Sequence, residues 1–450
     1  MKKNGADLLN GSLWDKIFMF ALPLAASNIL QQLFNSADMA VVGRFSGKAA
    51  LAAVGSNGSI INLLVNLFIG LSIGANVIIA RQIGKGEKEK ASKSAHTAIS
   101  ISVICGVIIM IAGLLIARPI LELMGSPEDV IDLATLYLRI YFLGMPFIML
   151  YNFGSALLRS IGDTKRPFVC LSISGVVNVI LNLLFVIGFK MGVAGVGFAT
   201  VISNMLSAGM VLYFLTHDES AVKIDRKKLC VDFSAIKEMA VVGIPAGIQN
   251  VVFSISNLSV QSSLNSLGSN VMAGSVAALN FERIVHFIFN AFTQACLTFT
   301  SQNFGAGKIN RCKKIIKLSL LQGFLVSTFA ISIFIIFREP LLRLYTKEEI
   351  VIPYGLTRMM ILLPLMTVNM VSEVISGALR GMKHPLAPAI ISVFGICVLR
   401  LVYVFTVFPK NPTFGNLLLV YPLSWTITTI GVIIAFLIYT RKTFKKGEEL

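Results

Sequence analysis

The chain has 450 residues, of which 55% are hydrophobic and only 14% are charged, and its formal net charge is +17. This balance excludes an ordinary soluble domain and is typical of a protein that crosses a membrane many times. The sequence contains no GxxxxGK[ST] run, so a P-loop ATPase is excluded as well.

Twelve apolar segments predict twelve membrane-spanning helices, because each is close to the ~20 residues that a bilayer requires. In chain order they cover residues 17–42, 51–79, 94–116, 133–158, 167–189, 193–215, 240–264, 271–300, 315–337, 353–379, 386–409 and 415–439. We therefore expect an all-α membrane protein. Its N-terminal six-helix lobe would cover 1–216, a cytoplasmic basic linker 217–239, and a C-terminal six-helix lobe 240–450.

The second half of the chain repeats the first when the sequence is shifted by 221 residues, or by 222 at the front. Gly84-Lys85-Gly86 then falls on Gly305-Ala306-Gly307, and Pro23 falls on Pro245. Such a repeat predicts two lobes related by a pseudo-two-fold axis with a cleft between them. Because a proline inside a helix frees a carbonyl and allows bending, we expect hinges at Pro23 and Pro245.

Basic residues are concentrated in the loops on one side of the predicted helices. With the N-terminus placed inside, the inner loops hold 27 Lys and Arg and the outer loops hold 8. The positive-inside rule therefore predicts that both termini lie in the cytoplasm, and we expect the protein in the plasma (inner) membrane. The basic run 223–228 could bind RNA or acidic lipid, but the same rule accounts for it without a nucleic-acid partner.

Carboxylates are scarce inside the predicted spans, where only Asp38, Glu282 and Glu373 clearly occur. A charged group in hydrocarbon costs at least ~2.5–3.5 kcal/mol, so such residues face the bundle interior or a water-filled cavity. Burial favours the neutral form of a carboxyl group. A carboxyl group that can lose and regain its proton can exchange that proton for a cation, which is the minimal chemistry of an antiporter.

Asp38 is the favoured candidate because its helix also carries a stripe of polar side chains. Asn28, Gln31, Asn35 and Asp38 follow a 3, 4, 3 spacing and therefore share one helix face. Such a stripe in an apolar helix predicts the lining of a water or substrate path. The alternative is that Asp38 lies near the outer end of its helix and is simply solvated.

The fifth predicted helix offers amide side chains as neighbours for this carboxylate. Asn178 and Asn182 are four residues apart and share a face, with Ser174 one turn earlier. Amides can coordinate a cation or hold a carboxylate without adding charge. They could equally form hydrogen bonds between helices, each of which contributes ~0.6–2 kcal/mol in a membrane.

The second half has its own candidate acids. Glu282 and His286 are spaced i, i+4, so they could meet on one face and share a proton. Glu373 has Arg380 two turns further along its helix. Each glutamate could belong to a second proton or substrate site. The alternative for each is a buried ion pair or a helix-end anchor.

Taken together, the motifs resemble those of the multidrug and toxic compound extrusion (MATE) family along nearly the full length of the chain. The resemblance rests on Pro23, Asn28 and Asp38, Gly84-Lys85-Gly86, the run 156–164, and the later runs 302–307 and 377–381. It implies a V-shaped pair of six-helix lobes. It also implies a transporter, not an enzyme, that uses a cation gradient to export amphipathic, often cationic compounds.

The resemblance also implies roles for particular residues. Asp38 matches the coupling-ion carboxylate of the N-terminal lobe. Asn178 and Asn182 match a helix 5 pair that is Asn and Asp in some members, and Thr200 and Tyr137 look like the accompanying polar groups. Because the second acid is missing here, the resemblance favours H⁺ over Na⁺ as the coupling ion.

The C-terminal lobe departs from the family pattern. The seventh helix has no acid between 240 and 265, and Asn369 stands at the acidic position of the tenth helix. A sodium site in that lobe is therefore not implied. We expect a monomeric H⁺ (or Na⁺) antiporter, without metal or cofactor, that exports amphipathic and cationic drugs or toxic metabolites. The alternative is a flippase or exporter of a lipid-linked saccharide, which would need additional spans or a strongly cationic cavity.

Overall fold

The computed structural model describes residues 7–125 and 127–448, and every regular element within these residues is a helix. Helices satisfy their own backbone hydrogen bonds, as a lipid environment requires. In the described part of the chain, eleven helices are long and apolar enough to cross a membrane, and one bent pair would make a twelfth. The predicted all-α membrane fold is confirmed.

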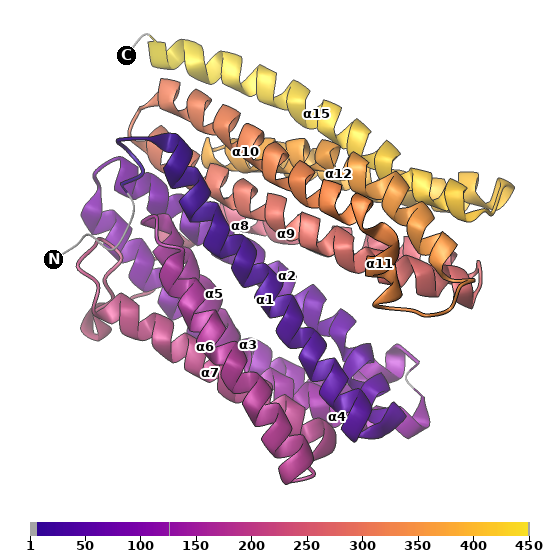
Figure 1. The fold of residues 1–450 in the computed structure, drawn as a ribbon. Helices are drawn as coiled ribbons and strands as arrows, with labels where there is room; N and C mark the ends of the chain where they lie inside the picture. The colour runs from indigo at the N-terminus through magenta and orange to yellow at the C-terminus, as the bar shows by residue number, and fades with distance from the viewer. Residues whose placement is uncertain (1–6, 126, 449–450) are drawn as a thin grey trace. The chain divides into compact units, whose positions relative to one another are not determined.

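The first half contains seven α-helices and one π-helical turn (Figure 1). They are α1 (Leu13–Phe45), α2 (Gly47–Gly84), α3 (Lys88–Leu123), α4 (Glu128–Leu143), α5 (Met145–Ser160), α6 (Lys165–Leu183), η1 (Leu184–Gly188) and α7 (Gly192–Thr216). The span predicted as one helix over 133–158 is instead the pair α4 and α5, bent by 46°. Pro146 lies at the start of α5 and cannot donate the backbone hydrogen bond that would continue α4.

The second half follows a short 3₁₀ turn, η2 (Arg226–Lys228). Its helices are α8 (Phe233–Asn265), α9 (Ser269–Gly305), α10 (Ile309–Ile336), α11 (Arg338–Arg343), α12 (Ile352–Gly381), α13 (Leu386–Ser392), η3 (Val393–Val398), α14 (Leu399–Val402), η4 (Tyr403–Val407), η5 (Phe408–Lys410) and α15 (Phe414–Glu448). The eleventh predicted span is therefore an α-helix interrupted by two π-helical turns.

The chain separates into two compact units that do not coincide with its two halves. Unit 1 is built on Ala26–Gly243, and unit 2 combines Leu8–Ala25 with Ile244–Leu450. The first part of α1 therefore belongs to unit 2, and the first part of α8 belongs to unit 1. Both helices change unit within two residues of the prolines predicted as hinges, Pro23 and Pro245.

The first part of α1 is held in unit 2 by aromatic packing and by hydrogen bonds to its backbone. The ring of Phe20 meets the ring of Phe299 edge-on, with centroids 5.5 Å apart. Gln322 Nε2 donates to the carbonyl oxygen of Trp14 at 2.7 Å. The lobes expected from sequence are continuous stretches of chain, so they place this segment in the N-terminal lobe. A division into continuous stretches cannot assign the first part of a helix to one unit and the rest to the other.

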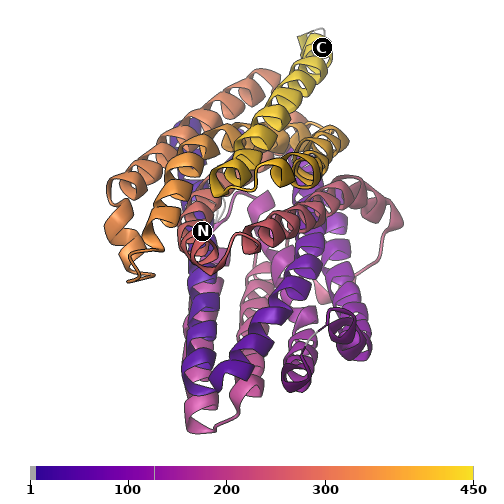
Figure 2. The same ribbon diagram turned by 90° about the vertical axis from the view of Figure 1, so that its right-hand side faces the viewer.

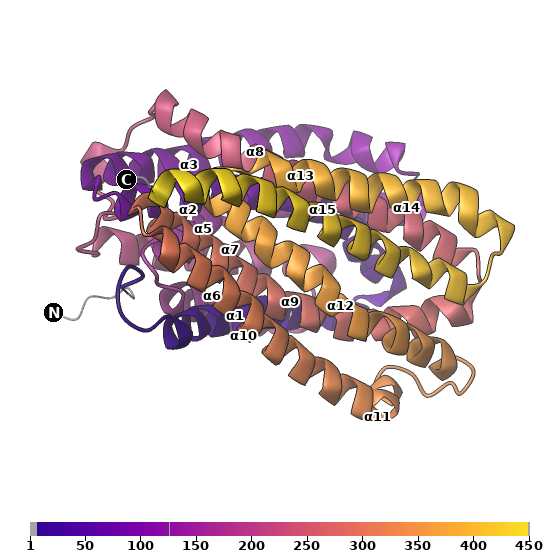
Figure 3. The same cartoon turned by 90° about the horizontal axis from the view of Figure 1, so that it is seen from above.

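Each unit is a layered helical bundle. In unit 1, α5 packs against α2, α3 and α7, and α6 packs against α7 (Figures 1 and 2). In unit 2, α9 and α12 pack closely together, α10 packs against both, and α15 packs against α12 (Figure 3). These contacts bring α6 against α7 in unit 1, and both α9 and α15 against α12 in unit 2.

The first part of α8 packs against α2 in unit 1 through glycines that permit backbone contact. A Cβ atom on Gly74 would lie 2.2 Å from the carbonyl oxygen of Met239. A Cβ atom on Gly243 would lie 2.8 Å from Cα of Leu71. The obstructing atoms belong to the backbone, so neither contact can be relieved by a change of rotamer.

We expect Gly74→Ala to lower the midpoint of thermal unfolding, because the added methyl group forces α2 and α8 apart at a cost of ~1–3 kcal/mol. Gly209→Ala is the matched control, because Gly209 lies within α7 and has no neighbouring atom within 4 Å of an added Cβ. Thermal unfolding of both variants in detergent measures the difference. Equal midpoints for the two variants would contradict the close crossing of α2 and α8.

Candidate functional site

The carboxylate of Asp38 lies in unit 1, toward the end of α1, where it contacts α6. Asn182 donates a hydrogen bond from Nδ2 to Asp38 Oδ1. The same nitrogen lies 3.2 Å from Asn178 Oδ1, and Asn178 Nδ2 lies 3.4 Å from Ser203 Oγ on α7. A polar chain therefore connects α1, α6 and α7, and the structure brings together the carboxylate and the two amides that the sequence singled out.

Close packing of α1 on α6 makes this hydrogen bond possible. An added Cβ on Gly175 would lie 1.8 Å from Cε2 of Phe34, so only glycine allows this aromatic ring to pack against α6. Gly175 lies seven residues before Asn182, two turns away on the same face of the helix. The glycine therefore helps to set the distance between Asp38 and its amide partner.

The amide side chains are buried and only partly satisfied. Asn182 is 0% exposed and Asn178 is 5% exposed, whereas Asp38 is half-buried. Asn182 Oδ1 has no hydrogen-bond partner among the described residues. A buried amide oxygen of this kind can accept a proton donor or a cation, so the amides form interhelical hydrogen bonds and keep an acceptor open beside the carboxylate.

Thr200 and Tyr137 are placed differently from each other. The Thr200 hydroxyl donates to the carbonyl oxygen of Val196 at 2.9 Å, so its proton stays on its own helix. Tyr137 is buried and lies within electrostatic range of Asp38, as does Tyr141, whose ring centroid is 6.2 Å away from that of Tyr137. Tyr141, four residues after Tyr137, is a neighbour of the site that the sequence analysis did not single out.

Ser203 was also missed by the sequence analysis. Its hydroxyl donates to the carbonyl oxygen of Thr200 at 2.9 Å and faces the amide of Asn178. The available signal was its spacing of three residues from Thr200, which places both on one face of α7. Serine is common in membrane helices, so this spacing alone did not separate it from the other serines of the chain.

The remaining polar residues of α1 do not share one environment. Gln31 and Asn35 are exposed, and Asn28 is half-buried. All three lie on α1 as expected, and their role in lining a substrate path remains a prediction.

In unit 2 Glu282 pairs with Arg358 and not with His286, which is the buried ion pair that the sequence left open as the alternative. Arg358 on α12 binds both carboxylate oxygens of Glu282, with Nε at 2.6 Å from Oε1 and Nη2 at 2.9 Å from Oε2. Arg358 Nη1 also donates to Ser275 Oγ at 2.7 Å. Because both oxygens are engaged by one guanidinium fork, Glu282 forms a buried ion pair and does not share a proton with His286.

His286 on α9 and Glu373 on α12 interact electrostatically, although they lie on different helices. His286 packs edge-on against Phe289, with ring centroids 4.7 Å apart, and interacts electrostatically with Glu373. Arg380 also interacts with Glu373 and donates from Nη2 to Gln249 Oε1 at 2.6 Å. The three residues proposed for a second site are therefore divided between an ion pair and this separate group.

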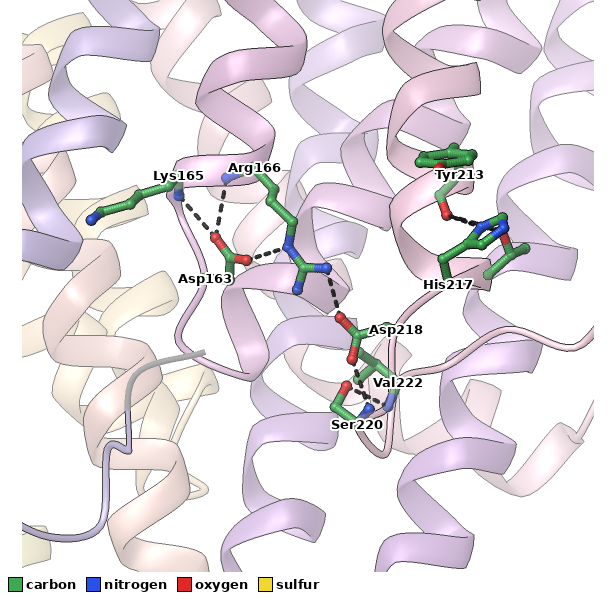
Figure 4. Close-up of polar contacts among 9 residues, drawn as sticks. Asp163, Lys165, Arg166, Tyr213, His217, Asp218, Ser220 and Val222 are labelled. Carbon is green, nitrogen blue, oxygen red and sulfur yellow. Dashed lines mark hydrogen bonds and ion pairs between the residues drawn. The ribbon is translucent and has the colours of Figure 1, made fainter. Parts of the chain in front are cut away.

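A chain of ion pairs fixes the start of α6 to the segment that follows α7 (Figure 4). Asp163 Oδ1 accepts hydrogen bonds from the backbone nitrogens of Lys165 at 3.0 Å and Arg166 at 3.1 Å. The guanidinium of Arg166 binds Asp163 Oδ2, and its Nη1 lies 2.7 Å from Asp218 Oδ2. This clamp holds α6, which carries both candidate amides, against the end of α7.

The clamp leads to a prediction about pH. Burial alone would raise the pKa of Asp218, but hydrogen bonds from Ser220 and Arg166 outweigh burial and hold the pKa below its usual range. A depressed carboxyl pKa stabilises the fold above the pKa of the unfolded chain, and this stability is lost as pH falls through the folded value. At neutral pH the free energy of unfolding of wild type should exceed that of Asp218→Asn by ~1–2 kcal/mol. This difference should disappear as the pH falls from about 5 to about 3.

Thermal unfolding midpoints in detergent, recorded across that pH range, measure this effect. Asp129→Asn is the control, because Asp129 is exposed at the start of α4. If the difference in unfolding midpoint between wild type and Asp218→Asn stayed constant with pH, the ionised clamp would be contradicted.

The sequence comparisons match both halves of the chain. A family model described as MatE matches residues 23–184 and again residues 245–406, so both matches begin at the aligned prolines. The probable multidrug resistance protein YoeA of Bacillus subtilis is 29% identical over 392 residues, covering 86% of this chain and 85% of that protein. The probable multidrug resistance protein NorM of Thermotoga maritima is 27% identical over 391 residues, covering 86% and 84%. A protein named FAD transporter from Shewanella oneidensis is 24% identical over 330 residues, covering 71% and 72%.

Solved structures share the fold. A crystal structure of MATE in complex with MaL6 aligns with a TM-score of 0.91 at 21% identity and covers all of both chains. A MOP superfamily transporter from Pyrococcus furiosus aligns with a TM-score of 0.90 at 22% identity, covering 100% of this chain and 99% of that one. The chain therefore shares the fold of these transporters.

Proposed function

The chain belongs to the MatE family of efflux transporters, and from that premise we propose that it is a secondary antiporter that exports amphipathic compounds in exchange for H⁺ or Na⁺. The members of this family are transporters and not enzymes. The names of the relatives, multidrug resistance and multidrug export proteins, support xenobiotic export as the function.

The observation that carries the proposal is the hydrogen-bonded pair of Asp38 and Asn182, with the open acceptor beside it. An ionised Asp38 accepts a hydrogen bond from the Asn182 amide. A protonated Asp38 carries an O–H donor instead. If the side-chain amide of Asn182 flips, its unpartnered Oδ1 can accept a hydrogen bond from this O–H. The pair therefore has a distinct arrangement for each protonation state, as an ion-coupled switch requires.

We propose H⁺ as the coupling ion, because the partners of Asp38 in this chain are neutral amides and not a second acid. Protonation from outside would favour drug release, and loss of the proton to the inside would let the cavity refill. The change of unit beside Pro23 lies on the same helix as Asp38 and offers a hinge. One proton moving down 100 mV supplies ~2.3 kcal/mol, and each pH unit adds ~1.4 kcal/mol.

The remaining expectations complete the proposal. Substrates would be amphipathic and cationic, and the protein would act as a monomer in the plasma (inner) membrane with both termini in the cytoplasm. The charge of the loops supports this orientation. No metal or other cofactor is needed for the exchange.

Transport by proteoliposomes tests this function, with ethidium as a fluorescent amphipathic cation. A pH gradient and a sodium gradient are imposed separately on vesicles containing wild-type protein. We expect the pH gradient to drive ethidium movement against its concentration gradient. Transport that only the sodium gradient drives would identify Na⁺ as the coupling ion. The absence of transport under both gradients would overturn antiport.

The buried arginines of unit 2 favour one alternative, an exporter or flippase of a lipid-linked saccharide, because such a lipid carries a phosphate linker. The same vesicles can be loaded with a fluorescent polyprenyl diphosphate lipid whose exposure to an impermeant quencher is followed. Faster exchange of this lipid than of ethidium would support the alternative.

A further inference from the structure

Unit 2 buries more positive charge than negative charge. Arg358 and Arg400 are only 4% and 3% exposed. Glu282 neutralises Arg358, but Arg283 interacts electrostatically with both of them, and Arg400 interacts with Arg358. Arg283 is exposed, so Glu282 offsets the buried charge of Arg358 and leaves that of Arg400 unbalanced. We call Arg283, Arg358, Arg400 and Tyr421 the arginine–tyrosine cluster.

Arg400 contacts neutral groups. Its Nη1 donates to Asn257 Oδ1 at 2.8 Å, and its Nε donates to Ser424 Oγ at 3.1 Å. Among the described residues, no carboxylate oxygen lies within ion-pair distance of Arg400. A buried charge without a counterion costs several kcal/mol, and ionisable residues inside membrane spans mark ligand or ion sites. Asn257 is itself exposed, so this polar path reaches the surface of α8.

Tyr421 connects the two buried guanidinium groups. Its ring centroid lies 5.4 Å from Cζ of Arg358 and 4.6 Å from Cζ of Arg400. Arg358 and Tyr421 also border a narrow recess with mostly apolar walls. The other residues of this recess are Val260, Gln261, Leu264, Leu417 and Leu418. The cluster therefore presents positive charge beside apolar side chains.

The cluster has no counterpart in the first half of the chain. Under the 221-residue shift, Arg358 falls on Tyr137 and Arg400 falls on Val179. Unit 1 carries an acid at its candidate site, whereas unit 2 carries excess positive charge. The repeat has thus kept the helices but placed an acid at the candidate site of unit 1 and arginines at that of unit 2, which indicates different ligands.

We propose that the arginine–tyrosine cluster binds the anionic group, a phosphate or a carboxylate, of an amphipathic substrate. Guanidinium forks match the paired oxygens of both groups, and apolar side chains lie beside the cluster. Calling this ligand a substrate rests on the proposed export function. The proposal extends the substrate class from cations to zwitterionic and anionic amphiphiles.

Binding is best followed by fluorescence, because Trp425 lies on α15 with its ring centroid 5.8 Å from that of Tyr421. The chain has two tryptophans, so a Trp14→Phe background leaves Trp425 as the single reporter. The full-length protein is placed in phosphatidylcholine nanodiscs without any ion gradient. Octyl phosphate, octylammonium, octanol and inorganic phosphate are titrated as probes.

We expect octyl phosphate to bind more tightly than octanol, octylammonium or inorganic phosphate. Arg400→Gln should weaken octyl phosphate binding about tenfold, whereas Arg400→Lys should weaken it less, because lysine keeps the positive charge but lacks the fork that binds two oxygens at once. Arg139→Gln, which removes an exposed in-span arginine of unit 1, should leave binding unchanged. Nanodiscs containing phosphatidylglycerol separate the two sources of phosphate: competition indicates a lipid headgroup, and no competition indicates a soluble amphiphile.

Three results would overturn the proposal: no preference for octyl phosphate over octanol in wild type, equal loss of all probes in Arg400→Gln, or inorganic phosphate binding as tightly as octyl phosphate. If Arg400→Gln does not fold, the order of the wild-type affinities for the four probes still tests the proposal. Asp38→Asn separates this inference from the proposed antiport, because it should lose ion coupling and still bind octyl phosphate normally.

Discussion

Asp38→Asn is expected to reduce gradient-driven ethidium transport by at least about 100-fold, the usual scale for loss of a group that transfers a proton. Asparagine preserves the size of the side chain and can still hydrogen-bond to Asn182, but it cannot take up or release a proton. The fold should persist, because Asp38 is half-buried and contacts neutral amides, so no buried charge is left without its partner. Rates under imposed pH and sodium gradients measure the effect.

Two variants serve as controls for that experiment. Asp38→Glu keeps an ionisable group and should retain part of the transport. Glu373→Gln removes a carboxylate from unit 2 near His286 and should leave coupling largely intact. If Glu373→Gln alone lost coupling while Asp38→Asn kept it, the coupling site would have to be moved to unit 2.

Glu282→Gln is expected to be the most destabilising single change considered for this protein. It leaves the guanidinium of Arg358, which is 4% exposed, without its counterion. Breaking a buried pair by removing one partner costs ~3–5 kcal/mol. The midpoint of thermal unfolding in detergent should fall accordingly, and the double variant Glu282→Gln/Arg358→Gln should recover part of the loss.

An exposed ion pair provides the matched control. Glu339→Gln removes a carboxylate that lies 2.9 Å from Arg343, and both of these side chains are exposed on α11. Exposed pairs contribute little to stability, so its unfolding midpoint should stay close to that of wild type. Equal midpoints for Glu282→Gln and Glu339→Gln would contradict a structural role for the buried pair.

The spans and the repeat could be predicted from sequence because both are local or periodic signals. A bilayer requires long apolar helices, so hydropathy locates them. The meeting of Asp38 with Asn178 and Asn182 could also be anticipated, because the amides share a face at i, i+4 and match a family pattern. The bend before Pro146 was missed because a proline in an apolar span does not show how far the helix will turn.

The partners of Glu282 and Arg400 could not be read from the sequence. Arg358 is 76 residues from Glu282, and Asn257 is 143 residues from Arg400. Helical spacing identifies neighbours on one helix, so it could offer His286 as a partner of Glu282 but could not name Arg358. The correct pairing depends on how α9, α12 and α15 pack. Leu8–Ala25 belongs to unit 2 because of packing between helices, which local sequence patterns do not reveal.

The central claim, exchange of substrate for a proton at Asp38, is tested most directly by proton release from the purified protein. Ethidium is added to wild type and to Asp38→Asn in a lightly buffered detergent solution at constant sodium concentration, and the pH change is recorded. We predict that ethidium releases protons from wild type and none from Asp38→Asn. Binding of ethidium to wild type without proton release, or equal release from both proteins, would contradict the account.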